Sequence, residues 1–193
     1  MNLSPQLTKQ AKEEVRSVTA LIDRVHDDGT LPMTNVSHKI SRGSQGTYYR
    51  GTGEIGIRKE GAVHPEMTLA HEVGHWIDDK ALPGHGFSSE NSPALAAWRK
   101  AVQESEAVQR LKTAPEYQEN KRYLRYALQG RELWARSYAQ YVATRSGDVK
   151  MLEQVTQVRA GKVAFLKDSQ WSAADFAPIA REMDNVFKEI GWL

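Results

Sequence analysis

One stretch of the chain constrains its fold more than any other: residues 68–79 contain the pattern His-Glu-x-x-His, and the residues that adjoin the two histidines are mostly apolar. In a helix, residues four apart project from the same face one turn apart, so His71 and His75 would point the same way. Two imidazoles so arranged can bind one zinc ion, with Glu72 beside them to accept a proton. We therefore expect residues 65–80 to form a helix that carries half of a metal site.

The flanks of this pattern predict that the helix is buried. Its apolar residues form two adjacent stripes: Leu69, Val73 and Trp76, and Ala70, Gly74 and Ile77. A helix that is apolar nearly all round belongs in an interior, and buried histidines need partners because burying them unpaired is costly. Gly74 costs about 1 kcal/mol relative to alanine within a helix. Its presence indicates that another element approaches closely there.

Asp78 falls on the same helical face as the two histidines, three residues after His75 and seven after His71. A carboxylate in that place is suited to accept a ring N–H from one of the histidines. An ordinary solvated aspartate fits the same position equally well.

Composition limits the metal ligands and the cellular setting. The 193 residues include no cysteine, so disulfides and thiolate sites are excluded and any metal must be held by His and carboxylates. The net charge of +2 gives no reason by itself to expect nucleic acid as a partner. No apolar run approaches membrane-spanning length, and a basic-then-apolar signal is lacking at the start. We expect a cytoplasmic protein, or one delivered without a cleaved signal, with no membrane partner; the oligomeric state stays open.

The length fits a single domain, residues 1–193, with the helix within residues 1–30 either belonging to it or extending it. Ser4 and Pro5 suit the start of that first helix, and residues 30–47 are expected to be a loop. Periodicity and breakers predict further helices over residues 93–111, from 115 to the interruption at 130, and over 131–145, 148–160 and 172–190.

Two short segments just before the metal helix predict a β-hairpin. Residues 47–50 and 54–59 are tyrosine-rich or alternating, and Gly51, Thr52 and Gly53 separate them. Ile55 and Ile57 would face inward. The fold class is therefore α+β, mainly helical with a small mixed sheet beside the metal helix.

Two histidines leave a catalytic zinc short of ligands, because such sites take three protein ligands and keep one position open. Glu132 is the best candidate for the third. It follows the break at Gly130, opens an apolar helical segment and lies 57 residues after His75 (132 − 75). A glutamate in the first turn is also favoured by the helix dipole, so position alone leaves the two interpretations even.

The two segments together resemble a known family. His71-Glu72-Val73-Gly74-His75-Trp76-Ile77-Asp78-Asp79, followed by Glu132-Leu133-Trp134-Ala135-Arg136-Ser137-Tyr138, is similar to the gluzincin pattern of the anthrax lethal factor catalytic domain and of related peptidase-like domains in phage and mobile-element proteins. The match covers about residues 67–80 and 126–142. Arg136 departs from it, because the relatives often carry a second acidic residue at that place.

The resemblance implies a zincin-like fold and a complete site. It implies that Zn²⁺ is bound by three residues, His71, His75 and Glu132. Glu72 would be the general base, and a catalytic tyrosine would lie shortly before the third ligand. Tyr126 is the nearest match for that tyrosine, with Tyr123 as the second choice.

The function that the resemblance implies is a zinc-dependent endopeptidase acting on a specific protein or peptide, as a phage factor or a toxin-like effector. Residues 54–59 would hold the substrate extended through backbone hydrogen bonds. The alternative is a non-proteolytic zincin-fold binding or accessory module of phage or mobile-element origin, against which an intact Glu72 argues. Basic residues Lys121, Arg122 and Arg125, with tyrosines between them, allow nucleic-acid binding, but a solvated helix face explains them more simply.

Overall fold

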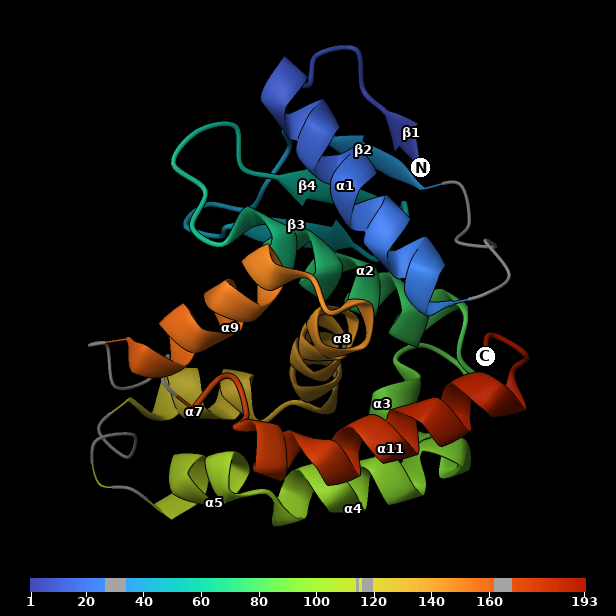
Figure 1. The fold of residues 1–193 in the computed structure, drawn as a ribbon, viewed down its shortest axis with the longest axis vertical. Helices are drawn as coiled ribbons and strands as arrows, with labels where there is room; N and C mark the ends of the chain where they lie inside the picture. The colour runs from blue at the N-terminus through green and yellow to red at the C-terminus, as the bar shows by residue number, and fades with distance from the viewer. Residues whose placement is uncertain (27–33, 114, 116–119, 162–167) are drawn as a thin grey trace.

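The computed structural model describes residues 1–193 except for 27–33, 114, 116–119 and 162–167. Helices dominate, and short strands form one mixed sheet at one end of the molecule (Figure 1), which confirms the expected α+β class. No helix in the described part of the chain is both long enough and apolar enough to span a membrane. The strands are β1 Asn2–Leu3, β2 Asn35–Ser37, β3 Gly46–Tyr49 and β4 Glu54–Ile57. The helices are α1 Lys9–Val25, α2 Pro65–Lys80, α3 Ser88–Asn91, the 3₁₀ turn η1 Pro93–Leu95, α4 Ala96–Glu104, α5 Glu106–Thr113, α7 Lys121–Ala127, α8 Gly130–Ser146, α9 Val149–Ala160 and α11 Ala173–Glu189.

The sheet has the strand order β1-β2-β4-β3, in which β1–β2 and β2–β4 are parallel and β3–β4 is antiparallel. The expected hairpin is confirmed as β3 and β4, with Tyr48 opposite Ile55. Ile55 and Ile57 are buried, as expected. The expected position of a substrate-pairing strand is wrong, however, because β4 has a neighbour on each side. The free edge of the hairpin is β3.

The N-terminal residues do not have the predicted secondary structure, because they pair with a distant segment. The backbone N–H groups of Asn2 and Ser4 donate to the carbonyls of Thr34 and Val36, at 2.8 and 2.9 Å. Residues 2–3 and 35–37 therefore form strands, although residues 30–47 were expected to be a loop and the first helix was expected to begin at Ser4. The first helix starts after Thr8, whose side chain accepts from the Ala11 N–H at 3.2 Å. Its expected end falls in residues 27–29, outside the described residues.

The long helix expected over residues 93–111 is instead η1, α4 and α5, and Ser105 separates α4 from α5. Its backbone is extended, and its hydroxyl donates to the carbonyl of Val102 at 2.7 Å and accepts from the Trp171 indole at 2.9 Å. Serine competes in this way with the helical backbone. The helices expected over 65–80, 131–145, 148–160 and 172–190 are confirmed as α2, α8, α9 and α11. The helix expected from residue 115 is described in part as α7, which Asn120 caps.

Helices α2 and α8 lie against each other at the centre of the molecule, between the sheet with α1 and a layer of α4, α5 and α11 (Figure 1). The buried residues of α1 belong to the same hydrophobic core as those of α2 and α8. Gly74 lies at the crossing of α2 and α8. A Cβ there would come within 3.0 Å of the Ala135 Cα and 3.1 Å of the Tyr138 Cβ. The close approach expected at Gly74 is confirmed.

Helix α9 fixes the start of α2. The Gln154 side chain accepts from the Met67 N–H at 3.1 Å and donates to the buried carboxylate of Glu66, which also pairs with Lys150. Because Glu66 has these partners, its pKa lies below the ordinary value although burial alone would raise it. The first turn of α2, which leads to the histidines, is therefore tied to a second helix.

Replacing Gly74 with alanine is expected to lower the free energy of unfolding by about 2 kcal/mol. Overpacking a tight core costs up to about 3 kcal/mol, and alanine gains about 1 kcal/mol over glycine in a helix. Urea denaturation measures the change. Gly51→Ala is the matched control, because nothing lies within 4 Å of a Cβ at that position, and its effect should stay within about 0.5 kcal/mol. A Gly74→Ala protein as stable as the control would contradict the close packing of α2 on α8.

Candidate metal centre

The structure brings the three predicted metal ligands together from two helices. His71 and His75 project from one face of α2, with ring centroids 4.7 Å apart and ring planes at 89°. Glu132, in the first turn of α8, lies opposite them. Its Oε2 is 3.5 Å from the His71 Nε2, and its Oε1 is 3.4 Å from the His75 Nε2. One ligand atom from each residue can be chosen so that all three lie within 4.8 Å of one another.

These separations fit a metal ion better than direct hydrogen bonds. A hydrogen bond between N–H and oxygen spans roughly 2.7–3.2 Å. In a tetrahedral zinc site with bonds of roughly 2.0–2.2 Å, neighbouring ligand atoms lie about 3.4 Å apart. The Oε2 of Glu132 is also buried without a hydrogen-bond partner among the described residues. Two imidazoles and one carboxylate form a donor set of catalytic zinc sites, so the residues present fit zinc.

The electrostatics of the cluster favour a bound positive charge. Burial raises the pKa of Glu132, but the two imidazoles outweigh it and hold this pKa well below the ordinary value. Burial lowers the pKa of His75, but Glu132 reverses the shift and leaves this pKa raised. The cluster therefore holds an ionised carboxylate that attracts a proton to the neighbouring ring. A divalent cation would satisfy the same attraction with all three groups as ligands.

Glu72 lies between the ligands and strand β3. Its side chain is 6% exposed, and a Cβ at Gly46 would lie 2.8 Å from the Glu72 Cγ and Oε1. Burial raises the pKa of Glu72; His71 and His75 lower it, Glu132 raises it, and the net shift is upward. A carboxylate whose pKa moves towards neutrality is suited to accept and return a proton. The glycine in β3 leaves the room that this carboxylate occupies.

Tyr126 reaches the rim of the site from α7. Its side chain is 49% exposed, and its pKa is raised by burial, by Glu132 and, less, by Glu72. The hydroxyl thus lies near both the third ligand and the candidate base. Tyr123 is further inside, with its ring centroid 6.4 Å from that of Tyr126. Of the two tyrosines, Tyr126 is the one whose pKa both Glu132 and Glu72 raise, which favours it as the tyrosine next to the ligand and the candidate base.

Asp78 differs from its expected role. It is fully buried, and its two carboxylate oxygens accept from Ser89, at 2.6 Å from the backbone N–H and 2.5 Å from the hydroxyl. The Nδ1 of His75 makes no hydrogen bond with any described residue. Burial raises the pKa of Asp78 to about 6, although the Ser89 donors oppose the shift. Asp78 anchors α3 to α2, and the structure does not place it as an acceptor for a histidine ring.

Arg136 has a role that sequence reasoning missed. Its buried guanidinium donates to the carbonyl of Glu132 at 3.1 Å and to the carbonyl of Ala127, the last residue of α7. Burial lowers the pKa of Arg136, while the nearby Tyr123, Glu132 and Tyr126 raise it. The side chain thereby joins the helix of the third ligand to the helix that carries Tyr126. The only signal in the sequence was that an arginine replaces an acidic residue of the resembled pattern.

A second group of side chains lies near the metal ligands, and no spacing in the sequence predicted it. The ring of Tyr48 in β3 stacks at 6.5 Å on that of His75, and its hydroxyl donates to Asp79 at 2.8 Å. Phe87 lies on another side, with its ring centroid 6.0 Å from that of His75. The guanidinium groups of Arg50 and Arg131 lie over the Phe87 ring, 5.4 and 5.3 Å from its centroid. Contacts between elements, rather than a local pattern, bring these side chains to the ligands.

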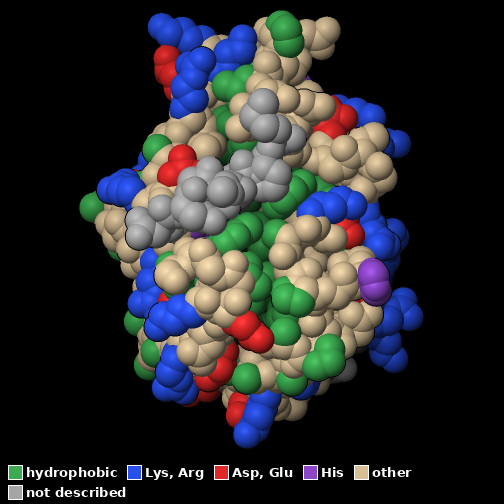
Figure 2. Space-filling model, turned by 90° about the vertical axis from the view of Figure 1, so that its right-hand side faces the viewer, with side chains coloured by type: hydrophobic (Ala, Val, Ile, Leu, Met, Phe, Trp, Pro, Cys, Tyr) green, Lys and Arg blue, Asp and Glu red, His purple; other side chains and the backbone are tan. Residues whose placement is uncertain are grey.

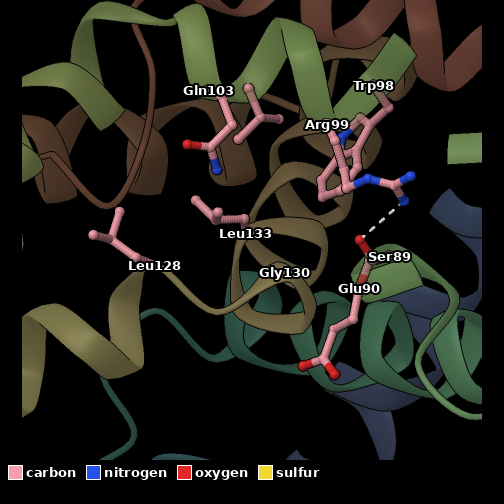
Figure 3. Close-up of a pocket in the computed structure, with 9 residues that line it drawn as sticks. Ser89, Glu90, Trp98, Arg99, Gln103, Leu128, Gly130 and Leu133 are labelled. Atoms are coloured by element: carbon pink, nitrogen blue, oxygen red, sulfur yellow. Dashed lines mark hydrogen bonds between the residues drawn. The ribbon is translucent and has the colours of Figure 1, made fainter. Parts of the chain in front are cut away.

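A cavity of about 220 Å³ opens beside the start of α8, between α3 and α4 (Figure 3). Arg99 points across it and donates to the Ser89 carbonyl at 3.3 Å, while Gly130 and Leu133 form part of the wall. None of the three ligands lines this cavity, and neither do Glu72 and Tyr126. It is therefore separate from the metal centre, although Ser89, which lines it, also donates to Asp78 of α2.

The chain matches no protein-family model, no curated protein and no solved structure. The residues and geometry of the centre itself are therefore what indicates a function.

Proposed function

We propose that this protein is a zinc-dependent endopeptidase with a zincin-like fold, which hydrolyses a peptide bond of a specific protein substrate. The observation that carries the proposal is the meeting of His71, His75 and Glu132, with ligand-atom separations of 3.4 and 3.5 Å. Glu72, adjacent to the first ligand, adds a buried carboxylate with a raised pKa. Three ligands and a base together form the set needed for metal-assisted hydrolysis.

Each side chain of the centre has a part in the proposed reaction. His71, His75 and Glu132 would hold zinc, which acts as a Lewis acid and makes water acidic enough to ionise near neutral pH. Glu72 takes the proton that the attacking water loses and gives it to the nitrogen of the leaving amine. The hydroxyl of Tyr126 donates a hydrogen bond to the substrate carbonyl oxygen, where negative charge develops as the carbonyl is attacked.

Strand β3 is the proposed place for the substrate backbone. It is the edge of the sheet that lies over α2, and Gly46 and Tyr48 lie next to Glu72 and His75, respectively. An extended peptide can add to such an edge through backbone hydrogen bonds. This arrangement would carry the scissile bond past the general base. It replaces β4 as the substrate-binding strand.

The proposal is tested by metal analysis followed by a cleavage assay. Purified protein is expected to contain about one zinc per chain and to cleave members of a peptide library. A chelator should stop the cleavage, and added zinc should restore it. Protein that holds zinc and binds peptides without cleaving any would instead indicate the non-proteolytic binding module. Protein that binds no zinc at all would contradict both functions.

A further inference from the structure

Helix α7, which brings Tyr126 to the site, has an unusual charge distribution. Residues 120–131 contain four basic residues and no acidic one. Three of them, Lys121, Arg122 and Arg125, are exposed on α7, and we call this set the basic face of α7. None of the three forms an ion pair with a described residue. The basic face therefore presents its charge to solvent.

This arrangement works against the helix that carries it. Lys121 and Arg125 are four residues apart, and Arg122 and Arg125 are three apart, spacings at which like charges destabilise a helix. Several other exposed cations in the described chain do have acidic partners: Lys100 lies 3.8 Å from Glu104, and Arg110 lies 2.7 Å from Asp168. On the face of the molecule in Figure 2, basic and acidic side chains are interspersed. Among the residues that the structure describes, the basic face of α7 has no counter-charge, and a ligand would supply one.

The basic face continues directly from the candidate metal centre. Arg122 precedes Tyr126 by one helical turn and shares its side of α7, and Tyr126 lies beside Glu132. The seven residues of α7 span about 10 Å along the axis. An extended peptide covers the same length with about three residues. A peptide whose scissile bond lies at the metal centre would thus pass the basic face within a few residues.

We propose, on the basis of the proposed peptidase function, that the basic face of α7 docks an acidic segment of the protein substrate, next to the bond that is cleaved. Charge complementarity identifies the occupant, since carboxylates would neutralise Arg122 and Arg125 in turn. The position favours a peptide over a nucleic acid, because the face begins where the scissile peptide would lie. A nucleic acid would need a longer basic track, whereas the whole chain has a net charge of only +2.

Binding of labelled peptides tests this surface separately from catalysis. The probes are a peptide with three consecutive glutamates, the same peptide with glutamines, and a single-stranded oligonucleotide, each measured by fluorescence anisotropy. The wild-type protein is expected to bind the glutamate peptide about 10-fold more tightly than the glutamine peptide at low salt. High salt should remove the difference, because exposed charges are screened. Equal binding of the two peptides by the wild-type protein would overturn the proposal.

Charge reversal supplies the matched pair of variants. Arg122→Glu combined with Arg125→Glu should abolish the preference for the glutamate peptide, and the new carboxylate at position 125 gains Lys121 as a partner, so the fold is kept. The control reverses two exposed cations on other helices, Arg16→Glu with Lys188→Glu, and should retain the preference. In cleavage assays, the first variant should raise KM for acidic substrates about 10-fold and leave kcat unchanged, since peripheral charges mainly affect association.

The outcomes separate the two proposals. Preference for the glutamate peptide without cleavage of any peptide would overturn the peptidase function and support α7 as a docking surface for acidic peptides. Cleavage with no preference for acidic sequences would support the peptidase and overturn the docking surface. Tighter binding of the oligonucleotide than of the glutamate peptide, lost on charge reversal in α7, would assign the basic face to nucleic acid and overturn the proposal.

Discussion

Replacing Glu72 with glutamine is expected to abolish peptide cleavage while zinc stays bound and the fold stays intact. Glutamine has nearly the same shape, so it fits the space that Gly46 leaves beneath β3. It cannot accept a proton from water at neutral pH, and loss of a positioned general base typically costs about 10²–10⁴-fold in rate. The three ligands His71, His75 and Glu132 are unchanged in this variant. The variant therefore separates proton transfer from metal binding.

The measurement is kcat for a peptide that the wild-type protein cleaves, together with zinc content and urea denaturation of the same preparation. Glu13→Gln is the matched control, because Glu13 is an exposed glutamate on α1 whose described ion pair is with Lys9 at 3.9 Å. This control should cleave at the wild-type rate. A Glu72→Gln protein that binds zinc and still cleaves as fast as wild type would show that another group takes the proton.

The sequence was most informative about features that depend on residues close together along the chain. The apolar stripes around His71 and His75 require only helical periodicity and burial, and α2 has the expected bounds and environment. Gly74 also indicates a contact with a distant part of the chain. Glycine weakens a helix, and it is tolerated where another backbone comes close. The structure shows that backbone to be α8, with the Ala135 Cα next to Gly74. The same crossing holds Glu132 opposite the histidines.

The sheet and the surroundings of Asp78 could not be predicted in the same way. Strands β1 and β2 are two and three residues long, and they exist because Asn2 and Ser4 bond to residues 34 and 36. No local pattern reports such a pairing, so the sequence could not show that β3, rather than β4, is the free edge. Asp78 lies on the expected face of α2, but α3 packs there and Ser89 occupies both oxygens.

Arg136 illustrates a further limit of pattern comparison. In the resembled pattern an acidic residue often stands at this place, so the arginine reads only as a departure. In the structure, its guanidinium bonds the carbonyls of Glu132 and Ala127, which no sequence spacing indicates. A buried cation needs several hydrogen-bond acceptors, and the first turn of α8 and the end of α7 supply them. The departure thus has a structural reason that links Tyr126 to the third ligand.

Replacing Glu132 with alanine is expected to have the largest effect on metal binding. Glu132 would supply the oxygen ligand from α8, and its carboxylate also attracts positive charge to His75. Zinc affinity should fall by more than about 100-fold, since loss of even an outer partner of a ligand costs about 10–100-fold. The wild-type protein at a free zinc concentration 1,000 times its Kd should gain about 4 kcal/mol in stability. The variant at the same concentration should gain no more than about 1.4 kcal/mol.

Thermal or urea unfolding with and without zinc measures these gains directly and does not depend on any substrate. Glu90→Ala is the matched control. Glu90 is a half-exposed carboxylate outside the ligand set, and it pairs at 3.9 Å with Arg131, the residue that precedes Glu132. It should keep the wild-type response to zinc. His71→Ala should lose the response as Glu132→Ala does, because either change leaves two protein ligands. An unchanged response in Glu132→Ala would remove α8 from the metal centre and leave α2 with an isolated pair of histidines, which would make the proposed peptidase site untenable.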